Sequence, residues 1–162
     1  MIARAFAAAA LLSLLAPCGA IAAPAAFPPP PWQRSDEVAP GVVAGRLAAK
    51  DRPVVIQIGY RELYDLGHVP GSRYAGPGEE PAGLANIRRA VGKLQRDREL
   101  VIYCGCCPSR ECANLIPAFK LLRSMGFKKL RVVAFEDDFT INWKNAGLPV
   151  ATPAGAAAAK TR

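Results

Sequence analysis

One stretch of the chain, Glu99 to Gly126, constrains the fold more than any other. Leu100 to Tyr103 is a short apolar run of residues that favour β-structure, which predicts a strand buried on both faces. From Cys112 onward the apolar residues recur at helical spacing, and Gly126 ends the pattern. The sequence therefore predicts a buried strand that ends at Cys104, followed by a tight loop and a helix.

The loop after this strand carries the candidate catalytic residues, Cys104 and Arg110. Backbone N–H groups of a loop and a helix N-terminus converge where such a strand ends, so we expect Cys104 to be a reactive thiolate. The guanidinium of Arg110 would supply a fixed positive charge for an oxyanion. The expected substrate-binding loop lies between them and consists of Gly105, Cys106, Cys107, Pro108 and Ser109. Enzymes that attack sulfane sulfur, phosphate or arsenate all use this pair, so the spacing does not choose among these reactions.

Strand and helix patterns alternate through the rest of the domain. Strands are expected at 53–58, 73–75, 100–103 and 130–135, and helices at 42–50, 60–66, 84–94, 112–125 and 139–146. This alternation predicts an α/β fold of three layers, with a parallel sheet of four to five strands and helices on both faces. Reactive sites in such sheets lie beyond the carboxyl ends of the strands, which is where Cys104 is expected.

The two ends of the chain are expected to lie outside this domain. Residues 1–23 have the basic, apolar and small-residue regions of a signal peptide, with an apolar centre too short for a membrane span. We therefore expect a periplasmic or secreted protein, with lipid attachment at Cys18 as an open alternative. A proline-rich spacer is expected at 24–35, the domain at 36–150 and a disordered, alanine-rich tail at 151–162.

Cleavage would remove Cys18 and leave four of the five cysteines, all between Cys104 and Cys112. Cysteines this close together cannot link distant parts of a fold, so the cluster indicates chemistry or metal binding rather than scaffolding. Because Cys106 and Cys107 are adjacent, they make a poor tetrahedral clamp, and we expect no metal and no other cofactor.

The formal charge of +8 comes from scattered lysines and arginines without interleaved aromatic residues. This pattern predicts no nucleic-acid partner, but it would attract small anionic substrates. His68 is the only histidine in the chain. Because it lies between glycines and a proline, we expect it to lock a turn by hydrogen bonding rather than to act as a general base.

Three segments resemble single-domain rhodaneses, a family of sulfurtransferases. They are the turn Gly67-His68-Val69-Pro70-Gly71-Ser72, the loop from Cys104 to Arg110, and the closing segment Trp143 to Val150. The resemblance implies a rhodanese-like domain in which Cys104 accepts sulfane sulfur as a persulfide. It implies an anionic donor of the thiosulfate or polysulfide type and a thiol or cyanide acceptor.

The chain departs from the usual rhodanese pattern at three places. Gln57 and Gly59 stand where an aspartate and an arginine are usual, and the usual glycine pair before the closing helix is replaced around Glu136 and Asp137. The Cys-Gly-Cys-Cys-Pro loop resembles that of an exported subgroup. An alternative function is a thiol redox or metal-binding module built on Cys104, Cys106, Cys107 and Cys112, in which the last three are candidate resolving cysteines. A cysteine phosphatase or arsenate reductase is a weaker alternative, because Tyr103 precedes Cys104 where those enzymes have histidine.

Overall fold

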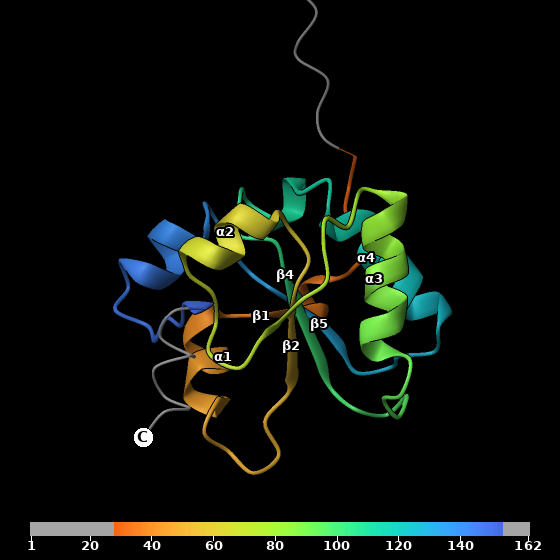
Figure 1. The fold of residues 1–162 in the computed structure, drawn as a ribbon, viewed down its shortest axis with the longest axis horizontal. Helices are drawn as coiled ribbons and strands as arrows, with labels where there is room; N and C mark the ends of the chain where they lie inside the picture. Colours follow the sequence, from red (N-terminus) through yellow and green to blue (C-terminus); the bar gives the residue numbers. More distant parts are fainter. Residues whose placement is uncertain (1–27, 154–162) are drawn as a thin grey trace, which may run out of the picture.

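The computed structural model describes residues 28–153 (Figure 1). The expected signal peptide at 1–23, Cys18 and most of the expected tail lie outside the described residues. Within the described part of the chain, no helix is long and apolar enough to cross a membrane.

A parallel sheet of five strands forms the centre of the domain, in the order β1-β5-β4-β2-β3. The strands are β1 (Glu37–Val38), β2 (Val54–Gln57), β3 (Arg73–Tyr74), β4 (Leu100–Tyr103) and β5 (Leu130–Val133). In the register of the central pair, Gln57 at the end of β2 lies beside Tyr103 at the end of β4. The carboxyl ends of the two strands therefore coincide, and Cys104 follows directly at this edge.

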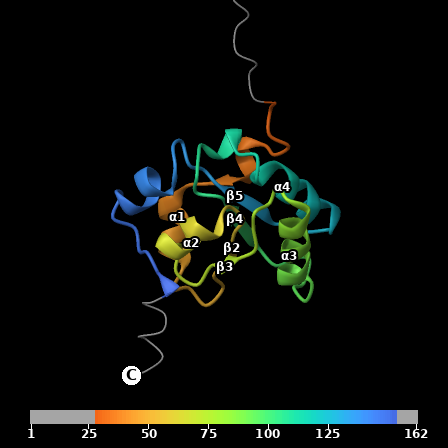
Figure 2. The same cartoon turned by 45° about the horizontal axis from the view of Figure 1, so that its top comes forward.

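Helices cover both faces of the sheet (Figures 1 and 2). The α-helices are α1 (Pro40–Arg46), α2 (Arg61–Leu66), α3 (Pro81–Val91) and α4 (Leu115–Ser124). Two short 3₁₀ segments, η1 (Arg34–Asp36) and η2 (Ser109–Glu111), and one π-helical segment, η3 (Thr140–Lys144), complete the set.

Alternate side chains of β4 point into two separate cores. Leu100 and Ile102 belong to the larger core, which is covered by α3 and α4. Val101 and Tyr103 belong to the smaller core, which also contains Trp143. Because all four residues of β4 are buried, the strand is apolar throughout rather than alternating, as is usual for a parallel sheet covered on both sides. The three-layer α/β architecture predicted from the sequence is confirmed.

The packed domain reaches slightly beyond the expected boundaries at both ends. Trp32, within the segment expected to be a spacer, is 2% exposed and packs against Phe119 with ring centroids 5.4 Å apart. At the other end, the backbones of Ala151 and His68 exchange two hydrogen bonds of 2.9 Å. Trp32 and Ala151 are therefore part of the folded unit.

Candidate functional site

The backbone of Cys104 is held where β4 ends. The amide of Gln57 on the neighbouring strand donates a hydrogen bond from Nε2 to the Cys104 carbonyl oxygen at 2.8 Å. Gly59 lies against the same residue, because a Cβ atom at this position would be 2.7 Å from the Cys104 sulfur. Gln57 and Gly59, which stand where rhodaneses usually have an aspartate and an arginine, therefore both lie against Cys104.

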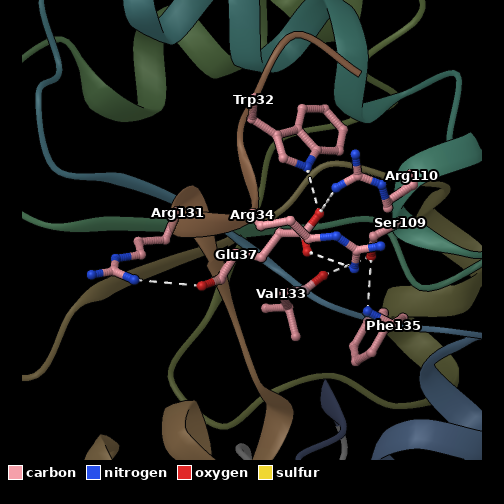
Figure 3. Close-up of polar contacts among 8 residues, drawn as sticks. All are labelled: Trp32, Arg34, Glu37, Ser109, Arg110, Arg131, Val133 and Phe135. Carbon is pink, nitrogen blue, oxygen red and sulfur yellow. Dashed lines mark hydrogen bonds and ion pairs between the residues drawn. The ribbon is translucent and has the colours of Figure 1, made fainter. Parts of the chain in front are cut away.

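Ser109 anchors the far end of the loop (Figure 3). Its hydroxyl donates to the Val133 carbonyl at 2.6 Å and accepts from the Phe135 N–H at 3.1 Å, and its own N–H donates to the Phe135 carbonyl at 2.9 Å. Ser109 is buried, so these bonds replace contacts with water. The loop is therefore fixed to β4 at its start and to the end of β5 at its close.

Three of the loop cysteines come together. The sulfur atoms of Cys104, Cys106 and Cys112 all lie within 4.8 Å of one another, and the Cys104 and Cys106 sulfurs are 3.2 Å apart. Cys104 and Cys112 are buried, whereas Cys106 is exposed. Cys107 is outside this group, and its sulfur contacts that of Cys106 at 3.2 Å. The three grouped sulfurs could hold a metal ion.

The shared hydrogen bonds move negative charge away from Cys104. Donation to the Cys106 sulfur raises the pKa of the Cys104 thiol, and burial raises it further. Donation from Cys104, and then from Cys112, holds the pKa of the exposed Cys106 well below its usual range. The exposed Cys106 sulfur therefore carries a negative charge more readily than the buried sulfur of Cys104, which we expect to be the nucleophile.

Arg110 pairs with a carboxylate from the first strand (Figure 3). Its guanidinium donates to Oε1 of Glu37, which also accepts a 3.1 Å hydrogen bond from Nε1 of Trp32. The Glu37 side chain is 7% exposed, so it depends on these partners. We expected Arg110 to face the anion bound at Cys104, but its described contacts instead tie the loop to β1.

The turn Gly67–Ser72 is fastened to the residue before Cys104. The Tyr103 hydroxyl accepts a hydrogen bond from the Val69 N–H at 3.0 Å and contacts the Ser72 hydroxyl at 3.3 Å. His68 is buried, its Nδ1 lies 2.9 Å from the Tyr64 carbonyl oxygen, and its ring stacks on that of Tyr64. These contacts confirm the predicted turn-locking role of His68.

A small pocket opens beside Cys104, between α2 and η3. Its lining includes Cys104, Gly105, Gln57, Thr140 and Lys144. The Oε1 atom of Gln57 is buried and has no hydrogen-bond partner among residues 28–153. Sequence reasoning did not single out Lys144. The only signal was its place directly after Trp143 in the closing segment.

Comparison with known proteins agrees with this architecture. No family model matches the sequence, and no curated protein matches it. Among solved structures, the crystal structure of the Alr3790 protein from Anabaena sp. is similar, with a TM-score of 0.54 and 21% identity over 71% of this chain and 91% of that one. The solution structure of the rhodanese-like domain of the same protein gives a TM-score of 0.52 and 21% identity over 72% of this chain and 79% of that one.

These similarities define the fold of the chain. It is a single-domain rhodanese-like fold, as the resemblance of its three motifs implies. At 21% identity the likeness establishes architecture rather than activity.

Proposed function

We propose that the protein is a sulfurtransferase that carries sulfane sulfur as a persulfide on Cys104. One observation supports this most directly: in a rhodanese-like fold, the Cys104 sulfur lies at the carboxyl end of the central strand β4, on a loop anchored at both ends. A sulfur fixed in this way presents one atom to a donor, and covalent capture divides the transfer into two easier steps.

The first step is a displacement at sulfur. The Cys104 thiol gives its proton to water at the pocket, and the resulting thiolate attacks the outer sulfur of the donor. The donor's sulfur–sulfur bond breaks, and the leaving group departs with the electron pair, as sulfite when the donor is thiosulfate. In the second step an acceptor thiolate or cyanide attacks the outer persulfide sulfur and regenerates the Cys104 thiolate.

The donor would bind in the pocket beside Cys104. Lys144 provides a positive charge there for the anionic end of thiosulfate or a polysulfide. Within residues 28–153, the N–H groups of Gly105 and Cys107 donate to no backbone carbonyl, so they can stabilise charge on the persulfide. The Cys106 N–H already donates to the Cys104 sulfur. Arg110 acts in this scheme as a positioning residue through Glu37.

The experiment that tests the proposal is sulfur transfer by the Cys104→Ser protein. The variant should lose thiosulfate-to-cyanide transfer, because a serine of similar size cannot form a persulfide. Native mass spectrometry of the parent protein after donor treatment should find one added sulfur atom, mapped to Cys104. Cys107→Ser is the matched control, since its sulfur lies outside the group around Cys104. Parent-level transfer by Cys104→Ser would assign the nucleophile to Cys106 instead.

A second function, a thiol redox module, is favoured by the 3.2 Å contact between Cys104 and Cys106. The Cys106 thiolate can attack the inner sulfur of the Cys104 persulfide, which forms a Cys104–Cys106 disulfide and releases hydrosulfide. The protein would then be inactive until an external reductant restores both thiols. Thiol counting and peptide mapping after donor treatment in the absence of acceptor should find this disulfide. Four free thiols in the mature chain would contradict it.

We also propose that residues 1–23 direct export, so that the reaction takes place in the periplasm or outside the cell. N-terminal sequencing of the exported protein should begin at Ala23 or Pro24. An exported chain that retains Met1 would contradict cleavage, and lipid on Cys18 would indicate membrane attachment instead.

A further inference from the structure

Three cysteine sulfurs from three different segments converge at one point. Cys104 comes from the end of β4, Cys106 from the middle of the loop and Cys112 from the residue after η2, and their sulfurs are mutually within 4.8 Å. We propose that these three cysteines form a binding site for a soft metal ion with a preference for thiolates, namely copper(I). Metal binding at this site does not require the proposed sulfur transfer, although both would use the Cys104 sulfur.

The spacing of the sulfurs fits three-coordinate binding. A metal–sulfur bond of about 2.3 Å places three sulfurs around one ion about 4 Å apart. The separations here run from 3.2 Å, between Cys104 and Cys106, to less than 4.8 Å. An ion could therefore be accommodated by small side-chain rotations, with the loop backbone left in place.

The surroundings favour a soft ion that enters from one side. Cys104 and Cys112 are 1% and 0% exposed and belong to the apolar core, whereas Cys106 is exposed at the surface of the site. An ion would meet Cys106 first and then be taken up by the two buried sulfurs. Because Ser109 fixes the loop to β5, the three positions are held before the ion arrives.

The ligand set selects copper(I) over zinc. Zinc in structural sites takes four nitrogen or sulfur ligands, and within residues 28–153 this group contains three. His68 does not contribute, because its ring is engaged by Tyr64. Soft thiolates suit copper(I), which is satisfied by two or three sulfurs. The adjacent cysteines Cys106 and Cys107 would make a poor metal clamp, but the fold brings Cys112 to the site and leaves Cys107 out.

Binding has a defined stoichiometry and a defined consequence. Copper(I) replaces whatever thiol protons the three cysteines carry and gives a tris-thiolate complex, with no change in oxidation state. The bound ion would occupy the Cys104 sulfur, so it would also block persulfide formation.

The test is an anaerobic titration of the reduced, mature protein with copper(I) in competition with a chromogenic copper(I) chelator. We expect one ion per chain. Alkylation followed by peptide mapping should then find Cys104, Cys106 and Cys112 protected and Cys107 reactive. The same titration with zinc(II) should give weaker binding. No sulfur donor is present, so failure of the sulfurtransferase proposal would not affect the result.

Two variants separate the site from nonspecific thiol binding. Cys112→Ser should weaken copper(I) binding more than about 100-fold, since it removes a ligand rather than an outer partner. Cys107→Ser should leave binding unchanged. Far-ultraviolet circular dichroism checks that each variant folds, and the protection map of the parent protein does not depend on any variant. Equal weakening by the two substitutions, or protection that includes Cys107, would overturn the proposal, as would preferential binding of zinc.

Discussion

At the scale of single residues, the charge of the pocket beside Cys104 comes from Lys144. Among the described residues that line this pocket, Lys144 is the one with a charged side chain. It is exposed and lies at the end of η3. An exposed positive charge stabilises a bound small anion by about 1 kcal/mol at moderate salt. It therefore favours the binding of anionic donors over neutral ones.

We therefore predict that Lys144→Gln raises the KM for thiosulfate roughly fivefold, with a much smaller effect on kcat. Steady-state assays at low and high salt measure this effect, which should shrink as salt screens the charge. Lys120→Gln, on the exposed side of α4, is the matched control and should change neither parameter. An equal increase in KM with a neutral persulfide donor would show that Lys144 does not act through its charge.

Residue types and their spacing predicted part of the site. Cys104 could be found because a buried strand ends at it, and His68 because its neighbours define a turn. The partner of Arg110 could not be found in this way, since Glu37 is 73 residues away and reaches the loop only through the pairing of β1 with β5. The lowered pKa of Cys106 also depends on three-dimensional contacts, because it results from sulfur atoms brought together by the fold.

At the scale of secondary-structure elements, the loop is fixed by its contacts with β1 and β5. Glu37 of β1 is nearly buried, and its carboxylate receives hydrogen bonds from Arg110 and Trp32 (Figure 3). Removal of the guanidinium would leave this carboxylate poorly compensated.

We predict that Arg110→Ala lowers the free energy of unfolding by about 1–3 kcal/mol. It should also reduce transfer from anionic and neutral donors by the same factor, because the loop as a whole is loosened. Denaturant unfolding and parallel assays with both donors measure the two effects. Arg88→Ala, on an exposed residue of α3, is the control and should be close to neutral. A loss confined to thiosulfate would return Arg110 to the anion-binding role expected from the sequence.

A second contact between elements makes stability depend on pH. Arg46 in α1 donates two hydrogen bonds, of 2.9 and 2.8 Å, to Glu99 just before β4. The hydrogen bond from Arg46 lowers the pKa of Glu99 below its usual value, so the folded state favours the ionised carboxylate. The stabilisation is present above the pKa of Glu99 in the unfolded chain and is lost as the pH falls through its lower pKa in the folded protein.

We predict that Glu99→Gln lowers stability at pH 7 by about 1 kcal/mol, a small value because both side chains are partly exposed. The difference between variant and parent should disappear as the pH falls below the lowered pKa of Glu99 in the folded protein. Thermal unfolding from neutral to acidic pH measures it. Glu111→Gln, on an exposed residue of η2, provides the comparison and should follow the parent curve. A constant difference at all pH values would assign the effect to packing rather than ionisation.

Most of the elements could be predicted because their signals are local. The strand Leu100–Tyr103 was predicted at its observed bounds, since a short apolar run between charged and turn residues has few other structures available. The strand β1 was missed because two residues carry no periodicity, and β1 exists only through its pairing with β5. The helix expected at 139–146 is a π-helical segment over Thr140–Lys144, a difference in winding that hydrophobic spacing does not reveal.

At the scale of the whole molecule, the boundary of the domain depends on one aromatic side chain. Trp32 is almost fully buried, and its ring packs in a tilted arrangement against the ring of Phe119 in α4. Its Nε1–H donates a hydrogen bond to the carboxylate of Glu37 in β1. It therefore joins the helical layer to the edge of the sheet. The polar and proline-rich residues around Trp32 do not indicate that it is buried. A single tryptophan outside any periodic pattern gives no spacing from which burial could be predicted.

We predict that a chain beginning at residue 36 is less stable than one beginning at residue 28, although the sequence places the start of the domain at 36. The shorter chain loses the Trp32 side chain from the core, and removal of a buried tryptophan typically costs about 3–5 kcal/mol. Denaturant unfolding of the two chains measures the difference. Trp32→Ala in the longer chain should reproduce most of the loss, because the tryptophan rather than the added length carries the contact. Equal stability of all three proteins would show that residues 28–35 are a spacer, as the proline content alone suggests.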